Sequence, residues 1–190
     1  MIIRGGGLGA SSHKDGHHCA IFPANGANTP VEIFESDTPL LVAERSLVMD
    51  SGGPGRMRGG LGRKMVIRVP DDDFGPQPPV TVAVQAGRFR YPPEGIFGGG
   101  TGSKAQFLRN REPADPSGMT FCERGDVIEF YSAGGGGYGS PLERDPEAVE
   151  RDVVNGYVSV EQARDDYGVV IDPETRQVDL EATRVRREIK

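Results

Sequence analysis

The stretch SGGPGRMRGGLGRKMVIRV, residues 51–69, decides the fold class of this chain. Its first part is a cluster of glycines, and its second part, residues 64–69, is a β-branched run. Such runs, bounded by Gly or Pro, are typical of short strands. The run does not alternate strictly, because Val66 falls among the polar positions. We therefore expect this strand to be covered on both faces for part of its length.

The same succession of glycine clusters and β-branched runs extends in both directions. Further strands are predicted at residues 31–35, 40–49, 80–84 and 126–131, and further glycine clusters occupy residues 5–9, 97–104 and 132–139. Together the 28 glycines and 15 prolines argue against an all-helical protein, since a helix interior loses about 1 kcal/mol per Gly and about 3 per Pro. Turns, bulges and strand ends are the expected places for these residues.

The last fifty residues change period and predict helices. DPE at 145–147 supplies an N-cap, a proline and an acid in the first turn, and Gly156 can end that helix. Ser159 and Gln162 fit a capping box. Residues 179–190 form either a charged final helix or a frayed, solvated tail.

These patterns predict a mainly β (α+β) fold. We expect a sandwich- or barrel-like β-rich domain with glycine-rich loops over residues 1–140. An acidic helical segment over 141–190 is expected to pack on it or to be partly disordered. The charge follows this division, since residues 1–110 carry a net +2 and residues 111–190 a net −8.

Composition also limits the class of protein. Cys19 and Cys122 are far apart and do not form the disulfide framework of a small secreted domain. Neither an 18-residue apolar run nor a secretory signal is found, so we expect a cytoplasmic protein. Residues 51–70 hold five basic side chains and no carboxylate, which could face an anion, a partner surface or solvent. They lack the aromatic residues of a nucleic-acid site, so we do not expect nucleic acid as a partner. Because no long apolar run is found, we do not expect a membrane as a partner either.

Three local motifs could bind ligands. Residues 5–10 match a dinucleotide fingerprint formally, but no helix follows them. Amides of residues 98–104 could form an anion nest, although tight turns are the more economical explanation of these glycines. His13, His17, His18 and Cys19 are weak metal candidates, because the adjacent pair His17 and His18 would point opposite ways in a strand. The alternative for these four is a polar loop.

The order of motifs along the chain resembles one family. The motifs are GGLGA, DGHHCAIFPANGANTPVEIFE, TPLLVAERSLVMDSGGPGRMRGGLG, FGGGTGSKA, GDVIEFYSAGGGGYGSPLERDPEAVERDV and VSVEQARDDYGVVI. In this order, from about residue 4 to 171, they are similar to the C-terminal part of the hydantoinase B / 5-oxoprolinase family. That family includes B subunits of ATP-dependent N-methylhydantoinases, the C-terminal half of 5-oxoprolinases, and subunits of acetone and acetophenone carboxylases.

The resemblance implies a chemistry shared between two parts. A partner of the hydantoinase A type uses ATP to phosphorylate the oxygen of a lactam, imide or ketone substrate, and the B part completes ring opening or carboxylation. Full-length members carry an Asp-, His- and Gly-rich block, with the look of a divalent-metal site, before the region matched here. We therefore expect a split small subunit, a truncation or an excised domain that is inactive alone. Its expected partners are the A-type subunit and the N-terminal portion of the B-type polypeptide.

The resemblance also implies candidate site residues. Asn28 and Thr29 are predicted to hydrogen-bond a substrate amide, and Arg56 or Arg58 to hold a phosphate or carboxylate. Asn25 is a further candidate for substrate binding. The other positions carried over are Pro30, Asp50, Ser51, Ser103 and Lys104, of which Ser103 and Lys104 are also predicted to bind substrate. ATP is expected to act through the partner, and no cofactor is expected in this chain.

Two alternatives to this interpretation stay open. All these residues could instead serve turns and contacts with a neighbouring subunit, which would make the chain a non-catalytic assembly module. A stand-alone metal protein that uses the histidine cluster is the other alternative.

Overall fold

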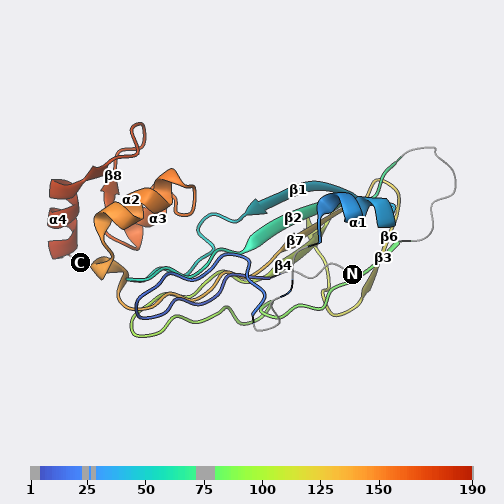
Figure 1. Ribbon diagram of the computed structural model, residues 1–190, viewed down its shortest axis with the longest axis horizontal. Helices are drawn as coiled ribbons and strands as arrows, with labels where there is room; N and C mark the ends of the chain where they lie inside the picture. Colours follow the sequence, from blue (N-terminus) through green and yellow to red (C-terminus); the bar gives the residue numbers. More distant parts are fainter. Residues whose placement is uncertain (1–4, 23–25, 27–28, 72–79, 190) are drawn as a thin grey trace.

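The computed structural model describes residues 5–22, 26, 29–71 and 80–189. Figure 1 shows an elongated molecule, with the larger sheet at one end, helices α2 to α4 at the other, and long glycine-rich segments between them. The helices are α1 (Val31–Asp37), α2 (Pro146–Val154), α3 (Val160–Asp165), α4 (Leu180–Ile189) and the 3-10 helix η1 (Pro141–Glu143). The strands are β1 (Leu41–Leu47), β2 (Arg63–Arg68), β3 (Val80–Ala83), β4 (Gln106–Arg109), β5 (Glu112–Pro113), β6 (Met119–Cys122), β7 (Val127–Tyr131), β8 (Val170–Ile171) and β9 (Val178–Asp179). No helix in these ranges has the length and apolar character that crossing a bilayer requires.

The larger sheet has five strands in the order β1-β2-β7-β4-β5, and all its neighbouring strands are antiparallel. Its edges are β1 and β5, so the sheet is open. A two-stranded ribbon of β3 and β6 packs on one face of this sheet. The predicted β-rich fold is therefore confirmed. The larger sheet and the β3–β6 ribbon form two unequal layers, and a third sheet of two strands, β8 and β9, lies at the helical end.

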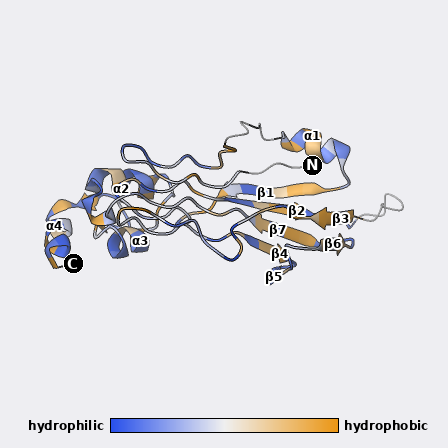
Figure 2. Ribbon diagram, turned by 90° about the horizontal axis from the view of Figure 1, so that it is seen from below, coloured by the Kyte–Doolittle hydropathy of each residue, from blue (hydrophilic) through white to orange (hydrophobic). Residues whose placement is uncertain are grey.

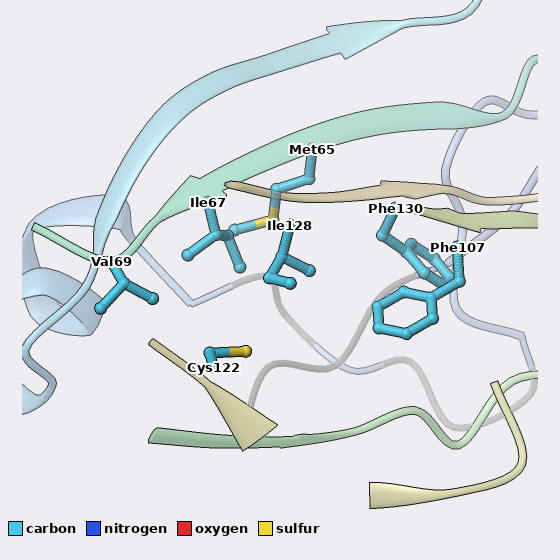
Figure 3. Close-up of a cluster of buried hydrophobic side chains, with 7 residues drawn as sticks. All are labelled: Met65, Ile67, Val69, Phe107, Cys122, Ile128 and Phe130. Atoms are coloured by element: carbon cyan, nitrogen blue, oxygen red, sulfur yellow. The ribbon is translucent and has the colours of Figure 1, made fainter. Parts of the chain in front are cut away.

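The main core lies between the sheet and the ribbon. Its buried members are Met65, Ile67, Val69, Phe107, Cys122, Ile128 and Phe130. Figure 3 shows Cys122, which ends β6, below the side chains that the larger sheet contributes. In β2, Met65, Val66 and Ile67 are all buried although successive residues face opposite sides. The prediction that this strand is covered on both faces is confirmed.

An apolar cavity remains between the two layers. It measures about 320 Å³ and is lined mainly by apolar side chains, among them Phe34, Val82, Phe107 and Phe130. This volume lies at the low end of the range for small-molecule sites. None of the predicted site residues lines it.

The predicted strand at residues 31–35 is wrong, because these residues form helix α1. The amide of Phe34 donates to the carbonyl of Pro30 at 3.2 Å, which closes the first turn. Phe34 packs against the core, and the carboxylate of Glu35 accepts from the amide of Val42 at 2.7 Å. These tertiary contacts outweigh the β-propensity of Val31 and Ile33, which is context-dependent.

The glycine clusters are more than turns, because they pack side by side as extended segments. The amide of Gly60 donates to Leu8, that of Gly135 to Gly60, and that of Gly53 to Gly135, each at 2.8 Å. The amide of Gly137 donates to Gly100 at 3.0 Å and so joins a further cluster. At most of these positions an added Cβ would meet backbone atoms of a neighbouring segment. Glycine is required there for close approach, as it is at the axis of collagen.

The helical end has its own hydrophobic cluster. Its buried members are Val149, Val153, Val158, Ala163, Tyr167, Val169 and Ile171. Figure 2 shows helices α2 to α4 with mixed hydrophilic and hydrophobic positions, whereas β3 and β7 are mainly hydrophobic. The final helix that the sequence predicts is α4. The predicted N-cap at Asp145 is confirmed, since its side chain accepts from the amide of Glu147 at 3.2 Å.

Half of the predicted capping box forms. The hydroxyl of Ser159 accepts from the amide of Gln162 at 3.0 Å. The amide of Ser159 donates to Asp50 at 2.7 Å instead of to Gln162. The side-chain oxygen of Gln162 is consequently buried without a hydrogen-bond partner in the described structure.

We expect Ser159→Ala to lower the free energy of unfolding by about 1 kcal/mol, because it removes an N-cap acceptor. Urea denaturation measures this change. Gln162→Ala is the matched control. It should lower the free energy of unfolding by less, because it removes a buried oxygen that has no partner among the described residues. Equal losses in the two variants would contradict the cap.

Candidate functional site

A buried group of charged side chains joins the glycine-rich segments to helix α2. Arg58, which is 3% exposed, donates through Nε to Asp152 at 3.1 Å and through Nη1 to the carbonyl of Gly59 at 2.7 Å. Arg144 donates to Asp152 at 2.8 Å and makes two bonds to Asp15, at 2.7 and 2.8 Å. We call Asp15, Arg58, Arg144 and Asp152 the junction cluster.

Two members of the junction cluster, Asp15 and Arg144, stabilise each other's charged forms. Burial alone would raise the pKa of Asp15, but the hydrogen bond and charge of Arg144 keep that pKa below its usual value. Burial alone would lower the pKa of Arg144. The hydrogen bond and charge of Asp15 and the charge of Asp152 outweigh burial, so the pKa of Arg144 is raised. The two arginines and two aspartates balance in charge, which is how buried ions are tolerated.

The two arginines predicted to hold an anion lie in different environments. Arg58 is engaged by Asp152 inside the junction cluster. Arg56 is exposed, and its Nη2 donates to the carbonyl of Ser12 at 3.2 Å. An incoming anion would therefore reach Arg56 from solvent but would have to displace Asp152 to reach Arg58.

Ser103 and Lys104, the predicted residues after the triple glycine, also lie in different environments. The amide of Ser103 donates to the carbonyl of Ser51 at 2.8 Å, and its hydroxyl accepts from the amide of Gly134 at 3.2 Å. Lys104 is exposed and has no ion pair with any described residue. Ser103 thus links two glycine segments, while Lys104 leaves a cation at the surface.

The NTP element is described only in part. Thr29 is half-buried and, with Pro30, directly precedes helix α1. Asn25 and Asn28 lie outside the described residues. The predicted contact of these three residues with a substrate stays a prediction.

Ser51 and Asp50, which the family resemblance also singled out, make structural hydrogen bonds. Ser51 is 1% exposed, and its hydroxyl accepts from the amide of Gly62 at 2.9 Å. The carboxylate of Asp50 accepts from the amide of Ser159, which ties the second glycine cluster to α3.

The histidine segment is only partly engaged. His13 and His17 are exposed, whereas His18 accepts at Nδ1 from the amide of Leu61 at 2.9 Å and packs on the ring of Tyr157. Burial and the charge of Arg58 lower the pKa of His18. Within the described ranges, no three His, Cys, Asp or Glu side chains gather as metal ligands.

Sequence reasoning missed three members of the junction cluster, namely Asp15, Arg144 and Asp152. Asp15 is 129 positions from Arg144, and Arg58 is 94 positions from Asp152. Each belongs to a motif quoted above, but no local pattern pairs them. Only the packing of α2 against the glycine segments brings them together.

The chain is similar in sequence to known proteins of one family. The model of the hydantoinase B/oxoprolinase family matches residues 1–141. The B component of a putative D-/L-hydantoinase of Pseudomonas sp. (strain NS671) is 32% identical over 198 residues, which cover 100% of this chain and 32% of that protein. The chain spans about a third of the length of the curated relatives it matches.

Two solved structures have a similar fold. An ATP-dependent caprolactamase from Pseudomonas jessenii superposes with a TM-score of 0.74 at 29% identity, over 96% of this chain and 32% of that one. A nucleotide-free acetone carboxylase superposes with a TM-score of 0.79 at 24% identity, over 97% of this chain and 29% of that one. The second likeness concerns the fold alone.

Proposed function

Because this chain belongs to the hydantoinase B/oxoprolinase family, we propose that it is the C-terminal segment or a split small subunit of an ATP-dependent cyclic amidohydrolase or ketone carboxylase. The observation that carries the proposal is the family match over residues 1–141, together with a span of about a third of the relatives. The partners would be a hydantoinase A type subunit and the polypeptide equivalent to the rest of the B-type component.

The proposed reaction overcomes the resonance stabilisation of an amide. The partner transfers the γ-phosphoryl group of ATP to the carbonyl oxygen of the substrate and releases ADP. Water then attacks the activated carbon and the ring C–N bond breaks, which frees the amine and leaves an acyl phosphate. A second water hydrolyses the acyl phosphate to a carboxylate and inorganic phosphate. The protein accelerates such a step mainly by positioning the water and the substrate and by placing cations that face the developing negative charge.

The exposed cations Arg56 and Lys104 are the side chains of this chain that we propose for that role. Both are accessible and lie beside glycine segments whose backbones are fixed by mutual hydrogen bonds. A fixed backbone supports pre-organised contacts. Asn25, Asn28, Thr29 and Ser103 remain proposed substrate contacts.

Reconstitution tests the proposal. We expect the chain, combined with an A-type subunit and the N-terminal portion of a B-type polypeptide, to give ATP hydrolysis that depends on a lactam or hydantoin, while the chain alone gives none. Phosphate release measures the activity. Failure of the three polypeptides to associate would rule out the subunit assignment.

The burial of Arg58 favours a second candidate, a non-catalytic assembly module. Arg58 is taken up by Asp152 and the Gly59 carbonyl, as expected of a structural residue. Arg56→Ala and Lys104→Ala separate the two candidates, since both side chains are exposed and their loss should leave the fold intact. Lost turnover with intact assembly favours a site, and lost assembly favours the module.

A further inference from the structure

A second pocket opens where strands β1 and β2 meet the histidine segment. Its volume is about 460 Å³, and its described lining residues are His18, Cys19, Arg45, Ser46, Leu47 and Arg63. It lies apart from the apolar cavity between the two layers, with which it shares no lining residue.

The wall of this pocket is basic. It includes Arg45 and Arg63, and no carboxylate is among its described lining residues. Arg45 is exposed and has no ion pair with any described residue. Other cations of the region are already engaged, since Arg58 pairs with Asp152 and Lys64 pairs with Glu44 at 2.7 Å. Arg45 is therefore the pocket cation that an incoming anion meets first.

The strand register brings the two pocket arginines to one face. Leu47 lies opposite Arg63 in the β1–β2 ladder, and Arg45 lies two residues before Leu47 on the same side of the strand. Arg45 and Arg63 are therefore diagonal neighbours, a spacing that long side chains can bridge. Arg63 as a whole is buried, at 8% exposed, whereas Arg45 remains accessible.

His18 adds a neutral donor. Its Nδ1 accepts from the amide of Leu61, so the proton of the neutral ring resides on Nε2. Burial and the charge of Arg58 lower the pKa of His18, which favours this neutral form. A guanidinium group and an imidazole N–H are donors that suit carboxylate and phosphoryl oxygens.

We propose that the pocket formed by His18, Arg45 and Arg63 binds an oxyanion, the carboxylate or phosphoryl group of a small molecule. This inference does not depend on the proposed enzymatic function, because the site lies within this chain and can be tested on it alone.

Calorimetric titration of the full chain with inorganic phosphate, and separately with acetate, tests the site at low ionic strength. We expect saturable binding of one anion per chain. Arg45→Gln should weaken it roughly tenfold or more, since a charge-assisted hydrogen bond is lost. Binding of phosphate alone would identify a phosphoryl site, binding of acetate alone a carboxylate site, and binding of both a general oxyanion site; each supports the proposal.

Arg68→Gln is the matched control. Arg68 is exposed at the opposite end of β2 and does not line the pocket, yet its replacement removes the same charge. Binding to this variant should equal that of the unmodified chain. Absence of saturable binding of both anions, or an equal weakening in Arg68→Gln and Arg45→Gln, would overturn the proposal.

Discussion

Asp152→Ala lowers the free energy of unfolding by about 3–5 kcal/mol, the range for breaking a buried ion pair by removal of one partner. Asp152 is 6% exposed and accepts from both Arg58 and Arg144. Without it, the buried guanidinium group of Arg58 keeps the carbonyl of Gly59 as an acceptor but loses its charged partner. Urea denaturation followed by circular dichroism measures the loss.

Glu147→Ala is the control for this prediction. Glu147 lies on the same helix, is exposed, and has no side-chain partner among the described residues. Its replacement should change the stability by no more than about 0.5 kcal/mol. If Asp152→Ala costs as little as Glu147→Ala, the junction cluster does not hold the helical end to the glycine segments.

The second large effect is expected at the glycine segments. Gly59→Ala places a methyl group 2.6 Å from the carbonyl carbon of Gly135, in a neighbouring segment. The backbone on both sides is hydrogen-bonded, so neither segment can move away without breaking these bonds. We expect a loss of about 3 kcal/mol or more, at the upper end of overpacking penalties. Chemical denaturation measures it.

Gly118→Ala separates crowding from the general effect of adding a methyl group. A Cβ at Gly118 meets no atom within 4 Å, and its φ is not in the left-handed region. That variant should be neutral or more stable by up to about 1 kcal/mol, because alanine restricts the unfolded chain. A loss at Gly118 as large as that at Gly59 would contradict the close-packing explanation.

The local part of the fold could be predicted because its causes are local. β2 and β7 are β-branched runs between breakers, and the caps at Asp145 and Ser159 need only residues two or three positions away. Helix α1 could not be predicted in this way, because its helical form depends on Phe34 meeting the core. β6 was also missed, because its outer residues Met119 and Phe121 are exposed and its inner face depends on β3.

The candidate site could also be predicted only in part. The motif order identified the family and pointed to Arg56, Arg58 and Lys104, but residue type alone does not tell an exposed arginine from a buried one. The structure separates Arg56, which faces solvent, from Arg58, which meets Asp152. It also unites Arg45 and His18 in one pocket, although Arg45 belonged to no candidate set.

The sequence by itself determined the β-rich class, the capped C-terminal helices and the family, since these depend on propensities, spacing and motif order. Only the tertiary structure decided what the glycines do. Composition suggests turns, but the segments lie against one another so closely that a Cβ has no room. That requirement comes from the meeting of segments distant in sequence, as does the junction cluster that joins Asp15 and Arg58 to Asp152 and Arg144.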